Sequence, residues 1–449
     1  MKEKYLIIFI TVISLITHFS FFGHPNEVVF DEVHFGKFVS GYLTHTYFFD
    51  IHPPLGKLII AGAAKIASFT PIFNFGTIGE KYANTDYLVL RFLPTLAGAL
   101  LAPIIYLLSR QLKFSKRVSA MAGIFVAFEN ALLVQSRFIL LDAFLLLFGF
   151  CAILFFLKFK DENRFPGYLL LSGIFSGLAG SIKWTGFGFL GLILIFYFID
   201  WIKNNRKLKN ALMGIFFLAI VPLLIYSLVF GIHFLLLTNS GTGDAFHSPE
   251  FQKTLHGSRY ENDENVQPMN MFNKLIELNI SLFTSNQGLT ASHPYSSSWY
   301  TWPFMARPIF FWQGSEASST QRIYSIGNPF VWWFGTFAVI ACLFGLIKNL
   351  IKRNFEKIDS TTIFLLVGYF INFLPFIFIG RVMFIYHYLP ALVFSILIVA
   401  NKIEKTDKSL SVPLALGAML IFLLFCPLSY GLSINQEYIN LITWLKSWI

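Results

Sequence analysis

Long apolar runs recur along the whole chain and leave few folds open to it. A helix needs roughly 17 to 25 apolar residues to cross about 30 Å of hydrocarbon. Segments of about this length lie near 5–22, 87–109, 117–135, 138–158, 167–182, 185–202, 210–236, 327–347, 361–379, 382–400 and 410–430. Charged residues make up only 13% of the chain, a composition that argues against an ordinary soluble protein. The sequence therefore predicts an all-α polytopic membrane protein with about 11 transmembrane helices.

Basic residues predict the orientation of these spans. If the N-terminus is cytoplasmic, the cytoplasmic segments hold more than half of the 34 Lys and Arg residues, in short runs such as RQLKFSKR at 110–117 and KNLIKRNFEK at 348–357. Short connections on the opposite side carry almost none, which is the positive-inside pattern. This placement accounts for the net charge of +10 without a nucleic-acid partner.

The spans and two long extracytoplasmic loops divide the chain into three expected parts. Residues 1–236 form an N-terminal transmembrane catalytic module, 237–326 an extracytoplasmic loop, and 327–449 a C-terminal four-helix transmembrane module. The first span is interpreted as a retained anchor, because its apolar region is long and no A-x-A-like cleavage site follows it. The three cysteines lie within apolar segments, which predicts packed thiols.

The first long loop, 23–86, carries ionisable residues beside apolar sequence. Its run from VVFDEVHF to FFDIHPPLGKLIIAGAAKIASF alternates apolar and polar residues at helical spacing and is interrupted by Pro53 and Pro54. Two interfacial helices joined by the HPP turn fit this pattern. They would hold four candidate site residues near the headgroup level: Asp31, Glu32, Asp50 and His52.

The adjacent carboxylates Asp31 and Glu32 cannot share one ligand, because neighbouring helical side chains point about 100° apart. One can face a substrate while the other holds structure. Glycosyl transfer to a hydroxyl needs a carboxylate that accepts the proton, and a lipid phosphate leaving group needs positive charge more than protonation. The alternative is a solvated helix start. The apolar surroundings favour function, since ionisable residues near membrane spans are costly.

Several motifs resemble one known family. FDEVHFGKF followed by FFDIHPPLGKL resembles the first lumenal loop of the dolichyl-phosphate-mannose protein mannosyltransferases. Further motifs similar to that family's pattern are RFLPTLAG at 91–98, SRFILLDA at 136–143, GSIKWTG at 180–186, HPYSSSWYTWP at 293–303 and GRVMFIYHYLPAL at 380–392. Together they cover nearly the whole chain.

The resemblance implies a GT-C type glycosyltransferase fold. It also implies an inverting, metal-independent transfer of mannose from a polyprenyl phosphate to Ser or Thr of an exported protein. Asp31 matches the family's catalytic acidic residue and Glu32 its partner, and Asp50 and Arg91 match positions used at its site. The loop 237–326 is too short for the β-trefoil MIR domain of eukaryotic members. This favours a prokaryotic plasma-membrane relative, which would have to recognise its acceptor without that domain.

Basic residues near the outer ends of the spans are candidates for the donor's phosphate. Arg91, Arg137, Lys183 and Arg381 all fall on the side of the membrane that bears Asp31. Each alone is commonly a snorkelling residue. Their convergence favours a phosphate site, with Arg91 ranked first and Arg381 and Lys183 next.

Other polar and aromatic residues have two interpretations each. Asp142, about one turn inside the fourth span, should pair with Arg137 or another outer cation. His52 joins the donor site, and His387 either contacts the sugar or phosphate or caps a polar pocket. An aromatic belt or a wall for the acceptor or carrier would explain the group His293, Tyr295 and Trp299.

Two other functions remain open from the sequence. The same scaffold could glycosylate a lipid or cell-wall glycan, as the aminoarabinose transferases do, or it could transport lipid-linked sugars. Transporters place their polar site at the midplane, whereas these ionisable residues gather at one face. No His and carboxylate spacing typical of a metal site is present, so neither a metal nor another cofactor is expected. The expected partners are the lipid donor, the exported acceptor and the bilayer; pairing of two copies is left open.

Overall fold

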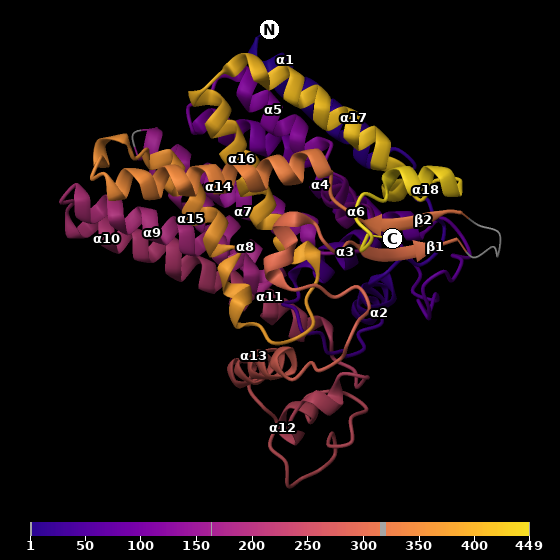
Figure 1. Ribbon diagram of the computed structural model, residues 1–449. Coiled ribbons are helices and arrows are strands. Elements are labelled where there is room, and N and C mark those ends of the chain that lie inside the picture. Colours follow the sequence, from indigo (N-terminus) through magenta and orange to yellow (C-terminus); the bar gives the residue numbers. More distant parts are fainter. Residues whose placement is uncertain (1, 163, 315–319, 449) are drawn as a thin grey trace.

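The structure, a computed structural model, describes residues 2–162, 164–314 and 320–448. It is a bundle of helices with a smaller projection at one end (Figure 1). The helices of the apolar segments are α1 (Glu3–Phe19), α4 (Tyr87–Gln111), α5 (Lys116–Ala127), α6 (Asn130–Arg137), α7 (Asp142–Asp161), α8 (Pro166–Ile182), α9 (Phe187–Lys203), α10 (Leu208–Ile215), α11 (Val221–Leu236), α14 (Pro329–Ile351), α15 (Ser360–Ile371), α16 (Leu389–Lys405) and α17 (Ser411–Tyr430).

Each of the apolar segments expected to span the membrane is largely helical. In the described part of the chain, 8 helices are long and apolar enough to cross a membrane, or up to 9 if the bent pair α5 and α6 forms one span. The helices α1 and α8 have only 17 residues each. The sequence placed Asp142 about one turn inside the fourth span. In the structure the helix α7 begins at Asp142, so this residue lies at the start of the helix.

Two breaks between helices have local causes. The 53° bend between α5 and α6 occurs where buried Glu129 accepts a hydrogen bond from the backbone N–H of Leu132 at 2.7 Å and so begins a new helix. Between α8 and α9, the turn passes so close to α8 that a Cβ on Gly186 would lie 2.3 Å from the carbonyl oxygen of Ala179. Only glycine fits there, and Lys183 is left extended beside the turn.

The first long loop contains the two short helices expected from its pattern. These are α2 (Glu32–Leu43) and α3 (Leu55–Ile66), and Pro54 directly precedes α3. The two helices pack against each other, and α3 also packs on α4 and α8. The loop is thereby attached to the N-terminal half of the bundle.

The second long loop folds back onto the first. It contains α12 (Pro249–Gln252) and α13 (Met271–Gln287), which lie in the projection at the bottom of Figure 1. It also contains an antiparallel hairpin, β1 (Ile309–Gln313) and β2 (Arg322–Ser325), which the all-α expectation did not include. The rings of Phe30 and Phe311 stack at 4.0 Å, and the Trp312 indole donates to Glu27 at 2.8 Å. The chain closes with α18 (Gln436–Ile442).

Candidate active site

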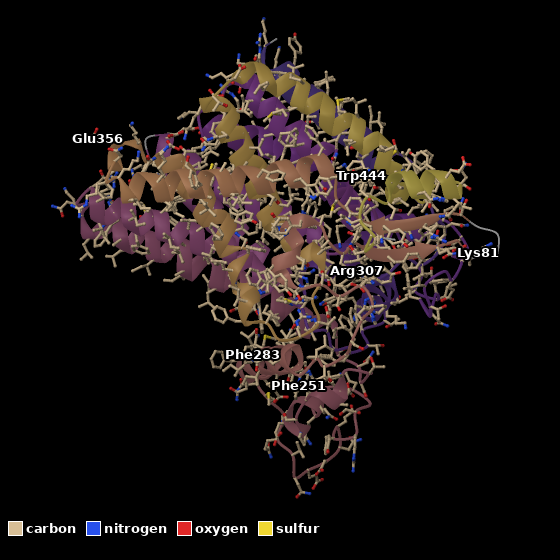
Figure 2. All side chains as sticks on the ribbon, viewed as in Figure 1. Lys81, Phe251, Phe283, Arg307, Glu356 and Trp444 are labelled. Carbon is tan, nitrogen blue, oxygen red and sulfur yellow. The ribbon has the colours of Figure 1, made fainter. Side chains whose placement is uncertain are left out.

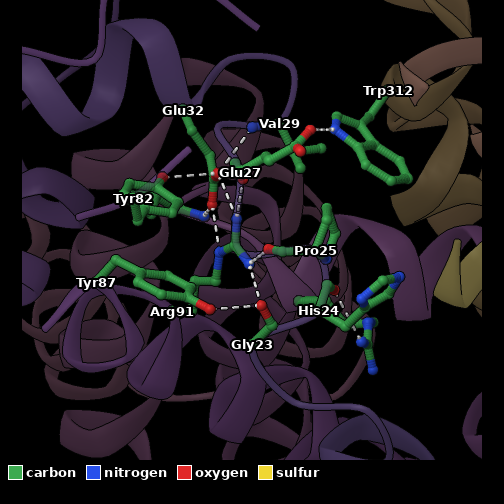
Figure 3. A network of polar contacts seen from close by, with 12 residues as sticks. Gly23, His24, Pro25, Glu27, Val29, Glu32, Tyr82, Tyr87, Arg91 and Trp312 are labelled. Carbon is green, nitrogen blue, oxygen red and sulfur yellow. Dashed lines mark hydrogen bonds and ion pairs between the residues drawn. The ribbon is translucent and has the colours of Figure 1, made fainter. Parts of the chain in front are cut away.

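Glu32 lies at the centre of a buried hydrogen-bond network (Figure 3). Its carboxylate forms a bidentate ion pair with Arg91, in which Nε of Arg91 donates to Oε1 at 2.8 Å and Nη2 donates to Oε2 at 2.7 Å. It also accepts from the Tyr82 hydroxyl at 3.0 Å and from the backbone N–H groups of Val29 and Ile139 at 2.9 and 3.0 Å. Both charged side chains have no exposed surface. Five donors therefore satisfy this buried carboxylate.

The other donors of Arg91 hold the start of the loop. They reach the carbonyl oxygens of Gly23, Pro25 and Glu27 at 3.2, 2.7 and 2.8 Å. Arg91 is not among the described residues that line the cavity of about 600 Å³ around Lys183 and Arg381. The guanidinium group is thus occupied with positioning the segment that leads into Asp31, and not with the phosphate contact expected from the sequence.

Asp31 has different surroundings from Glu32. It is the N-cap residue of α2, and its side chain is half-buried. Burial raises the pKa of this carboxyl to about 7, with the nearby charges of Asp142 and Asp50 adding to the rise and that of Lys183 opposing it. A carboxylate with a pKa near neutrality can both accept and release a proton under ordinary conditions.

Two further ion pairs stand beside Asp31. Lys183 donates to both carboxylate oxygens of Asp142, at 2.8 and 2.9 Å. Lys57 pairs with Asp50 and donates to the carbonyl oxygen of His52 at 2.9 Å. The sequence predicted that Asp142 pairs with an outer cation. In the structure this cation is Lys183, which is 41 positions away along the chain. The role of Lys57 was missed, although a lysine in the otherwise apolar run LGKLIIAG could have signalled a buried pair.

A cavity of about 600 Å³ opens next to these pairs. Its wall brings together four of the residues expected at the site, His52, Lys183, Arg381 and His387, and it also includes Asp142, which was expected to pair with an outer cation. The rest of the wall combines apolar residues with aromatic and polar ones, and sequence reasoning did not assign these aromatic and polar residues to the donor site: Trp184, Thr185, Phe283, Asn286, Gln287, Phe376, Phe378 and Tyr386. A volume of this size is typical of a small-ligand site.

The cavity has an unpaired positive charge. Among the described residues, Arg381 forms no ion pair with a carboxylate, whereas Lys183 is paired with Asp142. Burial, together with the charges of Lys183, Lys57, Arg381 and His387, keeps the pKa of His52 well below its usual value, so this ring is neutral. The site therefore has a net attraction for an anion, centred on Arg381.

Arg137 and the aromatic group lie outside the lining of this cavity. Arg137 donates to the carbonyl oxygens of His18 at 3.3 Å and Phe21 at 2.7 Å, and it lies 4.6 Å from the ring centre of Tyr430. Its contacts fix the end of α1. The three aromatic residues pack against other rings, with these distances between ring centres: 5.0 Å for His293 and Phe384, 5.8 Å for Tyr295 and Phe310, and 5.3 Å for Trp299 and Phe373.

The segment 293–303, which contains the aromatic group, packs against the segment that carries Arg381 and His387. The N–H of Ser297 donates to the carbonyl oxygen of Met383 at 2.9 Å, which joins the segment 293–303 to the segment that carries Arg381 and His387. Trp302 stacks on His387 at 5.8 Å, and Nδ1 of His387 lies 2.9 Å from the carbonyl oxygen of Phe384. These contacts fix the position of the His387 ring in the cavity wall.

Both halves of the chain match models of one protein family. Residues 8–238 match the family described as dolichyl-phosphate-mannose-protein mannosyltransferase. Residues 271–448 match the family described as the C-terminal four-transmembrane region of protein O-mannosyltransferase.

Curated relatives agree with these matches over part of their length. Dolichyl-phosphate-mannose–protein mannosyltransferase 4 of Candida albicans is 39% identical over 273 residues, which are 57% of this chain and 36% of that protein. Mannosyltransferase 1 of Saccharomyces cerevisiae is 38% identical over 272 residues, which are 58% of this chain and 33% of that protein. The matched region thus spans about a third of the length of these relatives.

Solved structures show that the fold is of the GT-C type. The chain superposes on a chain of the S. cerevisiae protein O-mannosyltransferase Pmt1-Pmt2 complex bound to the sugar donor with a TM-score of 0.93 and 22% identity, covering 100% of this chain and 93% of that one. ArnT of Cupriavidus metallidurans bound to undecaprenyl phosphate gives a TM-score of 0.55 at 14% identity, covering 95% of this chain and 64% of that one. At such identities the likeness establishes the fold alone.

Proposed function

The chain belongs to the dolichyl-phosphate-mannose-protein mannosyltransferase family, and we propose that it transfers mannose from a polyprenyl-phosphate-mannose donor to Ser or Thr hydroxyls of exported proteins. The proposed reaction inverts the anomeric centre and takes place at the extracytoplasmic face of a membrane, which we propose to be a prokaryotic plasma membrane. The observation that carries this proposal is that Asp31, whose pKa is raised to about 7, interacts electrostatically with Lys183 and Asp142, and that these two residues line a cavity that also holds the unpaired cation Arg381.

In the proposed step, Asp31 acts as the general base. Its carboxylate accepts the proton of the acceptor hydroxyl as the hydroxyl oxygen forms a bond to C1 of mannose. The bond from C1 to the phosphate oxygen breaks, and the electron pair stays on the lipid phosphate. Arg381 and Lys183 neutralise the charge that develops there, and the imidazole N–H groups of His52 and His387 in the cavity wall can donate hydrogen bonds to it. Because this charge comes from protein side chains, we propose that no metal cofactor takes part.

Glu32, Arg91 and Arg137 are proposed to position the base. The Glu32–Arg91 pair fixes the backbone that leads into Asp31, through the N–H of Val29 and the carbonyl oxygens of Gly23, Pro25 and Glu27. Arg137 fixes the end of α1, from which the loop begins. Asp50, paired with Lys57, contributes negative charge that supports the raised pKa of Asp31.

An apolar groove beside the cavity suits the donor's lipid chain. It has a volume of about 500 Å³, lies between α9, α14 and α15, and shares Phe378 with the cavity wall. Its other lining residues are Ile195, Leu343, Leu346, Ile363, Leu366, Val367, Phe370, Ile371, Leu374 and Pro375. We propose that the first isoprene units lie here, and that the segment with His293, Tyr295 and Trp299 contributes to the acceptor side.

The acceptor assignment is tested with purified protein and polyprenyl-phosphate-mannose. We expect mannose to appear on a Ser/Thr-rich peptide, and we expect none on the matched peptide in which every Ser and Thr is replaced by Ala. The anomeric configuration of the product, read by NMR, tests inversion. Transfer to a lipid or glycan acceptor in place of the peptide would contradict the proposed acceptor. It would favour the alternative function, a GT-C transferase that glycosylates a lipid or a cell-wall glycan.

The pH profile tests the state of Asp31. A base must be deprotonated to act, so kcat/KM should rise about tenfold per pH unit below the pKa of about 7 and level off above it. An unperturbed aspartate, with a pKa of about 3.9, would give a flat profile from about pH 5 upward. A flat profile between pH 5 and 8 would therefore contradict the assignment of Asp31 as the titrating base.

A further inference from the structure

A second polar cavity lies at the other end of the C-terminal helices. It has a volume of about 260 Å³ and lies between the last turns of α14 and α16 and the first turn of α15. Its wall includes Asn349, Lys357, Asp359, Thr362, Asn401, Lys402, Lys405 and Thr406. This wall shares no residue with that of the candidate active site.

The two cavities are separated by the length of α16. This helix starts next to His387, in the wall of the active-site cavity, and ends at Lys405 in the wall of the second one. Its 17 residues span about 25 Å. Figure 2 shows Glu356, the neighbour of Lys357, at the upper left of the bundle and Phe283, which lines the active-site cavity, at its lower edge. The second cavity is therefore at the expected cytoplasmic side.

The second cavity has an excess of positive charge. Lys405 forms an ion pair with Asp359, whose carboxylate also accepts from the N–H of Thr362 at 2.7 Å and so begins α15. Within the described part of the chain, neither Lys357 nor Lys402 forms an ion pair. Two lysines are thus left to attract an anion between the helix ends.

A buried acceptor complements these cations. The side chain of Asn401 is only 2% exposed. Its Nδ2 donates to the Thr362 hydroxyl at 2.8 Å, and its Oδ1 has no hydrogen-bond partner among the described atoms. Buried polar atoms are rarely left without a partner. A ligand that brings a hydroxyl group next to its negative charge would satisfy both features.

We propose that this cavity binds a phosphate group that carries or adjoins a hydroxyl donor. Lys357 and Lys402 would contact the phosphate oxygens, and Oδ1 of Asn401 would accept from the hydroxyl. Basic pockets between membrane helices are suited to anionic lipid headgroups, and a phosphoglycerol headgroup has this combination of groups. Soluble phosphate has the same chemistry, so the experiment separates the two sources.

Binding is measured with the full chain in neutral detergent and without sugar donor, so its outcome does not depend on the proposed transferase activity. Native mass spectrometry records adducts of phosphatidylglycerol and of phosphatidylcholine, and equilibrium dialysis records inorganic phosphate. The test variant is Lys357→Gln/Lys402→Gln. The matched control is Lys207→Gln/Lys209→Gln, which removes the same charge from the start of α10, on the same expected side of the membrane.

We expect phosphatidylglycerol to bind, and we expect the test variant to bind it roughly 25-fold more weakly, at about fivefold for each lysine near the membrane surface. The control variant should bind as the unmodified chain does. Binding of inorganic phosphate with the same loss in the test variant would support the proposal with a soluble source. Equal binding by both variants, phosphatidylcholine binding as tightly as phosphatidylglycerol, or no binding of either anion would overturn it.

Discussion

The Asp31→Asn variant should transfer mannose roughly 100-fold to 10,000-fold more slowly than the unmodified chain, which is the usual contribution of a positioned general base. Asparagine keeps the size of the side chain and removes its ability to accept the proton. Because Asp31 does not take part in the Glu32–Arg91 network, the variant should fold and bind donor normally. The measurement is kcat with the peptide acceptor, alongside donor affinity and thermal stability.

Asp86→Asn provides a matched control. Asp86 lies in the same long loop and is exposed. In the described part of the chain, its carboxylate accepts a side-chain hydrogen bond from Asn84 alone. The same chemical change there should leave kcat within about twofold, since surface substitutions away from a site have small effects. Transfer by Asp31→Asn at a near-normal rate would show that another group accepts the proton.

The Arg91→Met variant should lose about 3–5 kcal/mol of stability, because it leaves the buried carboxylate of Glu32 without its cation. Unfolding in mixed detergent micelles, followed by tryptophan fluorescence, measures this loss. Mannosyl transfer should fall along with stability, since the backbone that leads to Asp31 loses three carbonyl contacts.

The double variant Glu32→Gln/Arg91→Met distinguishes two contributions to the loss of stability: the loss of the ion pair itself, and the cost of leaving one buried charge without a partner. It should be less destabilised than the sum of the two single variants, because no unpaired buried charge remains. Lys113→Ala removes one partner of an exposed pair with Asp161 and should cost about 0–1 kcal/mol. If Arg91→Met unfolded no more easily than Lys113→Ala, the Glu32–Arg91 pair would not have the structural role assigned to it.

Local sequence patterns predicted much of the architecture. Hydropathy predicted the apolar helices, because burial in lipid requires a long apolar run within one continuous segment. The break at Pro53–Pro54 was visible because proline cannot continue a helix. The β hairpin was missed, since IFFWQ and RIYS are short and apolar runs of this length do not distinguish strand from helix.

The sequence by itself determined that this protein is a helical membrane protein, and its motifs identified the acidic pair in the first loop. Only the tertiary structure decided what each charge does: Arg91 joins Glu32 across 59 positions, Lys183 joins Asp142 across 41, and Arg381 is left unpaired in the cavity. The physical reason is that helix formation depends on neighbours within a few residues, whereas ion-pair partners depend on how distant helices pack. Which cation remains available for a phosphate follows from that packing and cannot be read from any one segment.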